Sequence, residues 1–202
     1  MPYKKTLDIL SKVFKNLNIK LKYVDLGGGF GIKYNKKDKQ INLNNYAKLV
    51  YNFKKKLNCD IIFEPGRSLV GNTGILVSKI QYIKKGQNKS FIIIDAGMND
   101  FMRTALYDAN HDIVPIVRTN KKNNEPIEFV GPICETTCKF IKYKKYQKIK
   151  EGDFVAITNA GAYGSSLSSN YNTKPLIAEI LAGKNTFKII RKKQDLFKLI
   201  NS

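Results

Sequence analysis

Two short stretches, 21–31 (LKYVDLGGGFG) and 60–67 (DIIFEPGR), decide the fold class of this sequence. Each starts with a short apolar run typical of a strand and ends in a turn that contains glycine. A pattern of apolar residues at helical spacing precedes each run, at 4–17 and at 45–57. The first 70 residues therefore predict the order α-β-α-β, with a glycine-containing loop after both strands.

Beyond residue 74 the hydrophobic period changes from the helical to the strand type, with turn residues between short apolar runs. This portion predicts a mostly antiparallel β-sandwich or Greek-key barrel. We expect an α/β domain at residues 1–73 and an all-β domain at residues 74–202. The expected strands are 75–84, 91–95, 113–118, 126–130, 139–146, 154–158, 176–181 and 186–190, followed by a helix at 192–200.

The composition is that of an ordinary globular chain, with 43% hydrophobic and 26% charged residues in 202. No apolar run approaches the roughly 18 residues that span a bilayer. The first residues form no long apolar segment of a secretory signal, so a cytoplasmic location without a membrane partner is expected. Three irregularly spaced cysteines fit neither a disulfide framework nor a zinc site with about four ligands, so no metal is expected.

The formal charge of +20 leaves a basic nucleic-acid-binding β-domain open as an alternative function. Only four of the 36 basic residues are arginines: Arg67, Arg103, Arg118 and Arg191. The lysines are spread along the whole chain beside many asparagines and isoleucines, a mixture that AT-rich codons also produce. Because specific readers of nucleic acid favour arginine, we interpret the charge as compositional bias and do not expect a nucleic-acid partner.

Five loop motifs carry polar residues near the ends of expected strands. They are GGGFG at 27–31, EPGR at 64–67, DAGMND at 95–100 with Arg103 and Tyr107 after it, GPICE at 131–135, and GAYG with SSNYNTKP within 161–175. Consecutive glycines let backbone N–H groups approach a phosphate, although this spacing fits neither common nucleotide fingerprint. If residues 95–107 are locally helical, Arg103 and Tyr107 lie on one face. Taken singly, each motif is also compatible with an ordinary turn or surface loop.

The order of these five motifs resembles the diaminopimelate decarboxylase family over about residues 24–179. The resemblance implies an enzyme that uses pyridoxal 5'-phosphate. It also implies the C-terminal part of an alanine-racemase-like (β/α)8 barrel, followed by the β-domain, in a homodimer whose active site is shared across the interface. The implied reaction removes the D-centre carboxylate of meso-diaminopimelate and gives L-lysine and CO2.

The resemblance also implies a role for each motif residue. The residues on the cofactor would be Gly28, Gly29, Glu64, Pro65, Gly66, Arg67 and Tyr163, with Glu64 at the pyridine nitrogen. The residues on the substrate would be Arg67, Arg103, Tyr107, Glu135 and Tyr163, with the two arginines on the distal carboxylate. Cys134, from the partner subunit, would be the acid that returns a proton to the decarboxylated carbon. Related ornithine-type decarboxylases typically place aspartate at the position of Glu135 and have no distal carboxylate to bind.

The sequence departs from the family pattern in three places. The lysine that the family links to its cofactor lies in an early motif like YAxKAN, and none of the 32 lysines here has that context. We therefore expect a truncated, split or misread chain that lacks an N-terminal half and is inactive, or nearly so, alone. A non-catalytic remnant that pairs with another fragment is the alternative. Cys138 and Thr104 stand where the family usually has aspartate and proline.

Overall fold

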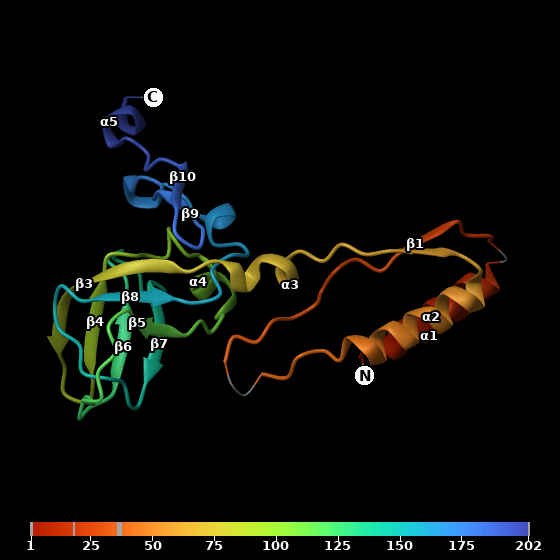
Figure 1. The fold of residues 1–202 in the computed structure, drawn as a ribbon, viewed down its shortest axis with the longest axis horizontal. Coiled ribbons are helices and arrows are strands. Elements are labelled where there is room, and N and C mark those ends of the chain that lie inside the picture. Colours follow the sequence, from red (N-terminus) through yellow and green to blue (C-terminus); the bar gives the residue numbers. More distant parts are fainter. Residues whose placement is uncertain (1, 18, 36–37, 202) are drawn as a thin grey trace. The chain divides into compact units, whose positions relative to one another are not determined.

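The computed structural model describes residues 2–17, 19–35 and 38–201. Its internal contacts divide the chain into two compact units, Met1–Leu69 and Val70–Ser202, which we call unit 1 and unit 2. The sequence prediction had set the boundary between its two domains after residue 73. Figure 1 shows the elements of both units in chain order.

Unit 1 has the predicted order α-β-α-β. Its elements are α1 (Pro2–Asn16), β1 (Tyr23–Asp25), α2 (Leu43–Leu57) and β2 (Asp60–Ile62). The strands β1 and β2 pair in parallel, so α2 is the crossover connection of a βαβ unit. Figure 1 shows α1 and α2 lying side by side. The unit therefore places the loops that follow β1 and β2 at the same end of a parallel pair.

Amphipathic helices build the core of unit 1. Each helix turns its apolar stripe inward while its lysines stay in solvent. The Asn42 side chain accepts a hydrogen bond from the Asn45 amide at 3.0 Å, which caps the start of α2. Asn58 ends the helix in the left-handed conformation, with φ of 49°. The buried core consists of Leu7, Val24, Tyr46, Val50, Phe53 and Cys59.

Unit 2 is built on one six-stranded mixed sheet. Its strands are β3 (Leu76–Lys85), β4 (Ser90–Ile94), β5 (Ile113–Pro115), β6 (Ile127–Val130), β7 (Lys139–Tyr143) and β8 (Phe154–Ile157). They lie in the order β5-β8-β3-β4-β6-β7, and every neighbouring pair is antiparallel except β4 with β6. A separate antiparallel pair, β9 (Glu179–Ala182) with β10 (Phe187–Arg191), and the helix α5 (Leu196–Ile200) follow.

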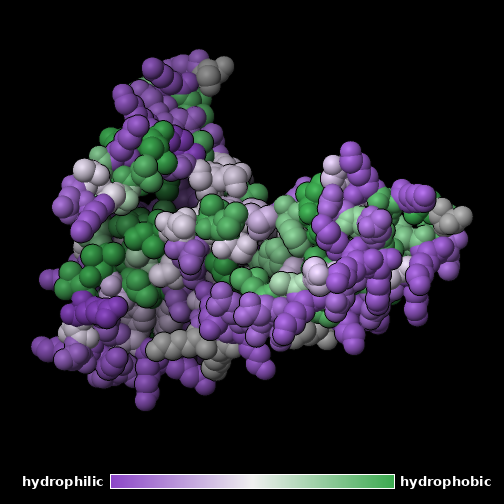
Figure 2. Space-filling model, turned by 45° about the vertical axis from the view of Figure 1, so that its right-hand side comes forward, coloured by the Kyte–Doolittle hydropathy of each residue, from purple (hydrophilic) through white to green (hydrophobic). Residues whose placement is uncertain are grey.

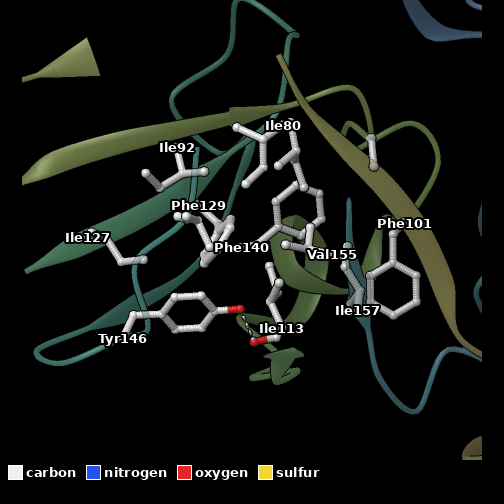
Figure 3. Close-up of a cluster of buried hydrophobic side chains, with 13 residues drawn as sticks. Ile80, Ile92, Phe101, Ile113, Ile127, Phe129, Phe140, Tyr146, Val155 and Ile157 are labelled. Carbon is white, nitrogen blue, oxygen red and sulfur yellow. Dashed lines mark hydrogen bonds between the residues drawn. The ribbon is translucent and has the colours of Figure 1, made fainter. Parts of the chain in front are cut away.

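The sheet of unit 2 curls around a single core. All six strands contribute side chains to one buried cluster, which Figure 3 shows in close-up. A flat sheet could not bring its two edge strands into the same cluster. Two tyrosine hydroxyls join those edges: Tyr143 accepts from the Ile113 amide at 2.8 Å, and Tyr146 donates to the Ile113 carbonyl at 2.9 Å. The core is therefore closed by side chains between β5 and the segment that contains and follows β7.

The structure differs from the sequence prediction in details of the β-rich part. The six strands form one curled mixed sheet, which is closer to the predicted barrel than to the predicted sandwich of two stacked sheets. The strand predicted at 113–118 ends at Pro115. The helix predicted at 192–200 begins only at Leu196, because the Asp195 carboxylate caps it by accepting from the Phe197 amide at 2.9 Å.

The surface mixes charged and apolar side chains. Figure 2 shows hydrophilic and hydrophobic groups interspersed on the face that it presents. Several large apolar side chains are exposed on β3, β5 and β8, namely Val77, Val114 and Phe154. Among the helices of the described residues, none has the length and apolar character that crossing a bilayer requires.

Candidate active site

The parallel pair β1–β2 brings the GGGFG and EPGR motifs together in unit 1. The Leu26 amide donates to the Ile62 carbonyl at 3.0 Å, and the Glu64 amide donates to the Gly27 carbonyl at 2.8 Å. A Cβ added to Gly28 would overlap the Glu64 carbonyl, so glycine is required at that position for the two loops to touch. The loops follow the carboxyl ends of adjacent parallel strands, which is where α/β folds place their ligands.

The glycines of these loops have conformations that other residues rarely adopt. Gly27 and Gly29 have φ of +65° and +77°. The Asp25 carboxylate fixes the start of the turn by accepting from the Gly27 amide at 2.7 Å. A Cβ built on Gly29 or on Gly66 would meet no atom within 4 Å, so open space lies beside the backbone of both loops. This backbone can approach an anion closely.

Polar side chains flank this open space in unit 1. Glu64 is exposed, whereas Pro65 and Arg67 are partly buried, and Gly66 is exposed between them. Arg67 begins the short helix α3 (Arg67–Val70). The structure therefore brings the predicted Gly28 against the predicted Glu64 and Pro65 within unit 1, with Gly29 as the next residue in the same loop.

In unit 2, a tightly hydrogen-bonded loop leads from β4 to Arg103. Within it, the Ser78 hydroxyl donates to the Asp95 carboxylate at 2.5 Å, and the Gly97 amide donates to the Asp100 carboxylate at 2.8 Å. Burial raises the pKa of the Asp100 carboxyl. The loop leads into α4 (Arg103–Tyr107), so the helical conformation considered for residues 95–107 is present only over these last five residues.

Arg103 is buried, with 6% of its surface exposed. Its Nη1 lies 3.2 Å from Nε2 of His111, and its guanidinium lies over the Tyr163 ring, 5.5 Å from the centroid. Tyr107, four residues later, is 63% exposed. The helical spacing of the two residues is as predicted, but only Arg103 turns into the core, so α4 is not an ordinary surface turn.

Tyr163, which lies beside Arg103, has a strained backbone conformation. It has φ of +63°, a left-handed conformation that costs a residue with a Cβ of order 1–3 kcal/mol. The neighbouring Gly161 packs so closely on the Val70 carbonyl that a Cβ there would overlap it. Because strained backbone conformations cluster at active sites and ligand clamps, this conformation supports the choice of the region as a candidate site.

Cys134 and Glu135 lie in the loop between β6 and β7. Both are exposed, and the Tyr171 hydroxyl donates to the Glu135 carboxylate at 2.5 Å. This hydrogen bond raises the pKa of the Tyr171 hydroxyl. Cys138 is buried, and its Sγ accepts from the Met98 amide at 3.4 Å. Cys138 thus ties the Cys134 loop to the loop that precedes α4.

Two residues of this region were missed as contributors to the site. His111 belongs to none of the five motifs, so no role is predicted for it from the sequence. Among the described residues, no group of three or more His, Cys, Asp or Glu side chains could hold a metal ion. Tyr171 belongs to the SSNYNTKP motif, but the sequence predicts no binding or catalytic role for it. The sequence feature that could have drawn attention to His111 is that it is the single histidine of the chain, eight residues after Arg103.

Comparisons with known proteins show which family and which sequences this chain is similar to. The sequence profile of the family described as "Pyridoxal-dependent decarboxylase, C-terminal sheet domain" matches residues 9–161. The diaminopimelate decarboxylase of Aquifex aeolicus is 39% identical over 197 residues, which make up 96% of this chain and 47% of that protein. The diaminopimelate decarboxylase of Helicobacter pylori is 40% identical over 187 residues, or 93% of this chain and 46% of that protein.

Solved structures show the same similarity. A crystal structure of an Aquifex aeolicus protein superimposes with a TM-score of 0.90 at 36% identity, over 99% of this chain and 50% of that one. Helicobacter pylori diaminopimelate decarboxylase complexed with L-lysine gives a TM-score of 0.84 at 39% identity, over 98% of this chain and 48% of that one. The chain therefore spans about half the length of the relatives that it matches.

Proposed function

This chain belongs to the family of pyridoxal-dependent decarboxylases, and from that premise we propose that it carries the C-terminal residues of an enzyme that converts meso-diaminopimelate into L-lysine and CO2. The observation that carries the proposal is the guanidinium of Arg103, held between the His111 imidazole and the Tyr163 ring. A fixed guanidinium suits a carboxylate, because its N–H groups match the two carboxylate oxygens. The relatives named above, diaminopimelate decarboxylases, support this choice of substrate.

The residues of unit 1 fit the phosphate group of pyridoxal 5'-phosphate. Open space lies beside Gly29 and Gly66, and the close contact of Gly28 with Glu64 holds the two loops together. Backbone N–H groups of these glycines would bind the phosphate, and the exposed Glu64 carboxylate would pair with the ring nitrogen. When bound, the cofactor supplies a sink for the electron pair that CO2 leaves behind.

The chain's own side chains then select and protonate the substrate. Arg67 and Arg103 would hold the distal carboxylate, with Tyr107 and Tyr163 as further contacts. Glu135 would accept from the distal ammonium group, and its contact with Tyr171 orients it for that task. The exposed Cys134, donated across a homodimer interface, would deliver the proton from its Sγ to the carbon that has lost CO2.

Unit 1 has the order α-β-α-β and one parallel strand pair, an arrangement that is compatible with the last units of a (β/α)8 barrel. We propose that the preceding barrel units, with the lysine that the family links to its cofactor, come from an N-terminal segment. This assignment explains why a parallel pair of strands occurs here without further strands of the same sheet among the described residues. The cytoplasm remains the expected location.

The test uses a joined enzyme, in which the part of the Aquifex aeolicus relative that precedes the matched region is fused to this chain. Arg103→Met is compared with Arg118→Met, which removes the same charge from an exposed position. We expect Arg103→Met to raise KM for meso-diaminopimelate about 10- to 150-fold, because hydrogen bonds to charged groups contribute about 1.5–3 kcal/mol. Arg118→Met should leave KM unchanged. Equal KM values in the two variants, or a preference for L-ornithine over meso-diaminopimelate, would contradict the proposal.

A further inference from the structure

The imidazole of His111 has two well-defined contacts that fix its protonation state. Nδ1 lies 2.9 Å from the Thr158 carbonyl oxygen, and Nε2 lies 3.2 Å from Nη1 of Arg103. A carbonyl oxygen only accepts, so Nδ1 must carry the proton. A guanidinium only donates, so Nε2 must be the unprotonated acceptor. The geometry therefore requires the neutral imidazole with its proton on Nδ1.

The surroundings of His111 favour this neutral form. The side chain is 1% exposed, and the Phe101 ring packs edge-on against it with centroids 4.6 Å apart. Burial is the largest cause that lowers the pKa of His111, and the positive charge of Arg103 lowers it further. The hydrogen bond to the Thr158 carbonyl and the charge of Asp112 act in the opposite direction. The net direction is downward, so the acceptor at Nε2 persists at neutral pH.

This arrangement does more than fill space. An aromatic ring of similar size would preserve the contact with Phe101 but would offer Arg103 no acceptor. With the imidazole on one nitrogen and the Tyr163 ring against its face, the guanidinium is held in one orientation. Protonation of Nε2 would replace the acceptor with a donor that carries the same charge as the guanidinium, so the contact would be lost.

We propose that His111 is a positioning residue: its neutral Nε2 holds the Arg103 guanidinium in the orientation in which it binds a carboxylate. The identity of that carboxylate, the distal one of the substrate, rests on the proposed function. L-Lysine keeps this carboxylate, whereas cadaverine has the same chain and two amino groups without it. The ratio of their affinities therefore measures the carboxylate contact directly.

The first measurement is independent of any activity. Because His111 is the single histidine, 15N NMR of the labelled 202-residue chain reports one imidazole. We expect the tautomer protonated on Nδ1, with a pKa below the usual value of about 6.5. Arg103→Met should raise that pKa, since the neighbouring positive charge is removed. A proton on Nε2 in the neutral form, or an unchanged pKa in Arg103→Met, would overturn the contact on which the proposal depends.

The second measurement is calorimetric binding of L-lysine and of cadaverine to the joined enzyme described above, loaded with pyridoxal 5'-phosphate and freed of excess cofactor. His111→Phe should lower the preference for L-lysine about tenfold, the scale of one hydrogen bond to a charged group. His111→Gln, whose amide oxygen can accept from Arg103 without titrating, should keep the preference. It should also remove the decline that sets in where the folded imidazole takes up a proton, at a pH lower than its usual pKa of about 6.5. Tyr146→Phe is the matched control: it removes another buried hydrogen bond to a carbonyl, that of Ile113, and should leave the preference unchanged.

The outcomes separate the two proposals. If the joined enzyme without substitutions binds L-lysine and cadaverine equally, or binds neither, the substrate assignment of the proposed function fails, and the NMR result alone decides whether His111 holds Arg103. If that enzyme prefers L-lysine and His111→Phe keeps the preference, the positioning role is refuted while the substrate assignment stands. An equal loss of preference in Tyr146→Phe would overturn the positioning role, because the effect of His111→Phe would then come from a general disturbance of the core and not from the contact with Arg103.

Discussion

At Gly28 the missing side chain is a steric requirement, because a Cβ there would overlap the Glu64 carbonyl. Gly31, in the same loop, would gain a Cβ in open space. We therefore predict that Gly28→Ala lowers the free energy of unfolding by about 1–3 kcal/mol, the usual cost of forcing an atom into a packed site. Gly31→Ala is the matched control. Urea unfolding of the purified chain measures both, and equal midpoints would show that the two loops are not in contact.

The buried imidazole of His111 leads to a second prediction, on how the stability of the folded chain depends on pH. Its pKa in the folded chain lies below the unfolded value of about 6.5, since burial disfavours the charged form. As the pH falls below about 6.5, the unfolded chain takes up a proton that the folded chain does not, so this contribution to stability is present above that pH and is lost below it. His111→Gln should show a smaller fall in thermal midpoint between about pH 7 and pH 5. An identical fall in both proteins would contradict the buried neutral imidazole.

Sequence reasoning reached most of the candidate site through the order of its motifs, but it missed how the residues hold one another. Arg103 and His111 are eight residues apart and meet only because the chain folds back between α4 and β5. No periodic pattern reports such a contact. The left-handed backbone of Tyr163 is equally invisible, since tyrosine gives no signal for positive φ. The assigned roles of the site residues remain predictions.

At the scale of elements, the hydroxyls of Tyr143 and Tyr146, which join the edges of the sheet, lead to a prediction about the free energy of unfolding. Tyr143→Phe would leave the Ile113 amide without the hydroxyl oxygen that it now contacts at 2.8 Å. Leaving a buried donor unsatisfied costs about 1–3 kcal/mol, so unfolding should require correspondingly less denaturant. Tyr82→Phe, on the exposed side of β3, is the control. If both substitutions have the same small effect, the hydroxyl does not close the sheet.

The elements themselves were largely predictable where periodicity was strong. The helices α1 and α2 and the strands β3 and β4 lie close to their predicted bounds, since their apolar residues recur at helical or strand spacing. The pairing order could not be predicted, because the parallel contact of β4 with β6 joins segments separated by α4 and β5. The first strand of the final pair begins at Glu179 rather than at residue 176, and both of its strands are mostly exposed, so burial gave little periodic signal.

At the scale of the whole molecule, the charge of +20 permits a direct test of the alternative function. If the charge is compositional, the chain should bind duplex DNA only weakly, with an affinity that falls steeply with salt and does not depend on base sequence. Arg103→Met and Arg118→Met should reduce that binding equally, because each removes one charge. Fluorescence anisotropy over a salt series measures this. Tight binding at physiological salt, which weakens steeply as the salt rises and which Arg103→Met affects no more than the loss of one charge, would favour the nucleic-acid-binding domain.

The central proposal also belongs to the whole molecule: these 202 residues would hold the phosphate-side and substrate-side groups of a decarboxylase, and the lysine for the cofactor would come from a segment outside them. The most direct measurement is the formation of L-lysine from meso-diaminopimelate, with cofactor binding followed by visible absorbance. The chain alone should form none, and the joined enzyme should form L-lysine and CO2 in equal amounts. L-Lysine formed by the chain alone, or none formed by a folded joined enzyme loaded with cofactor, would contradict the account.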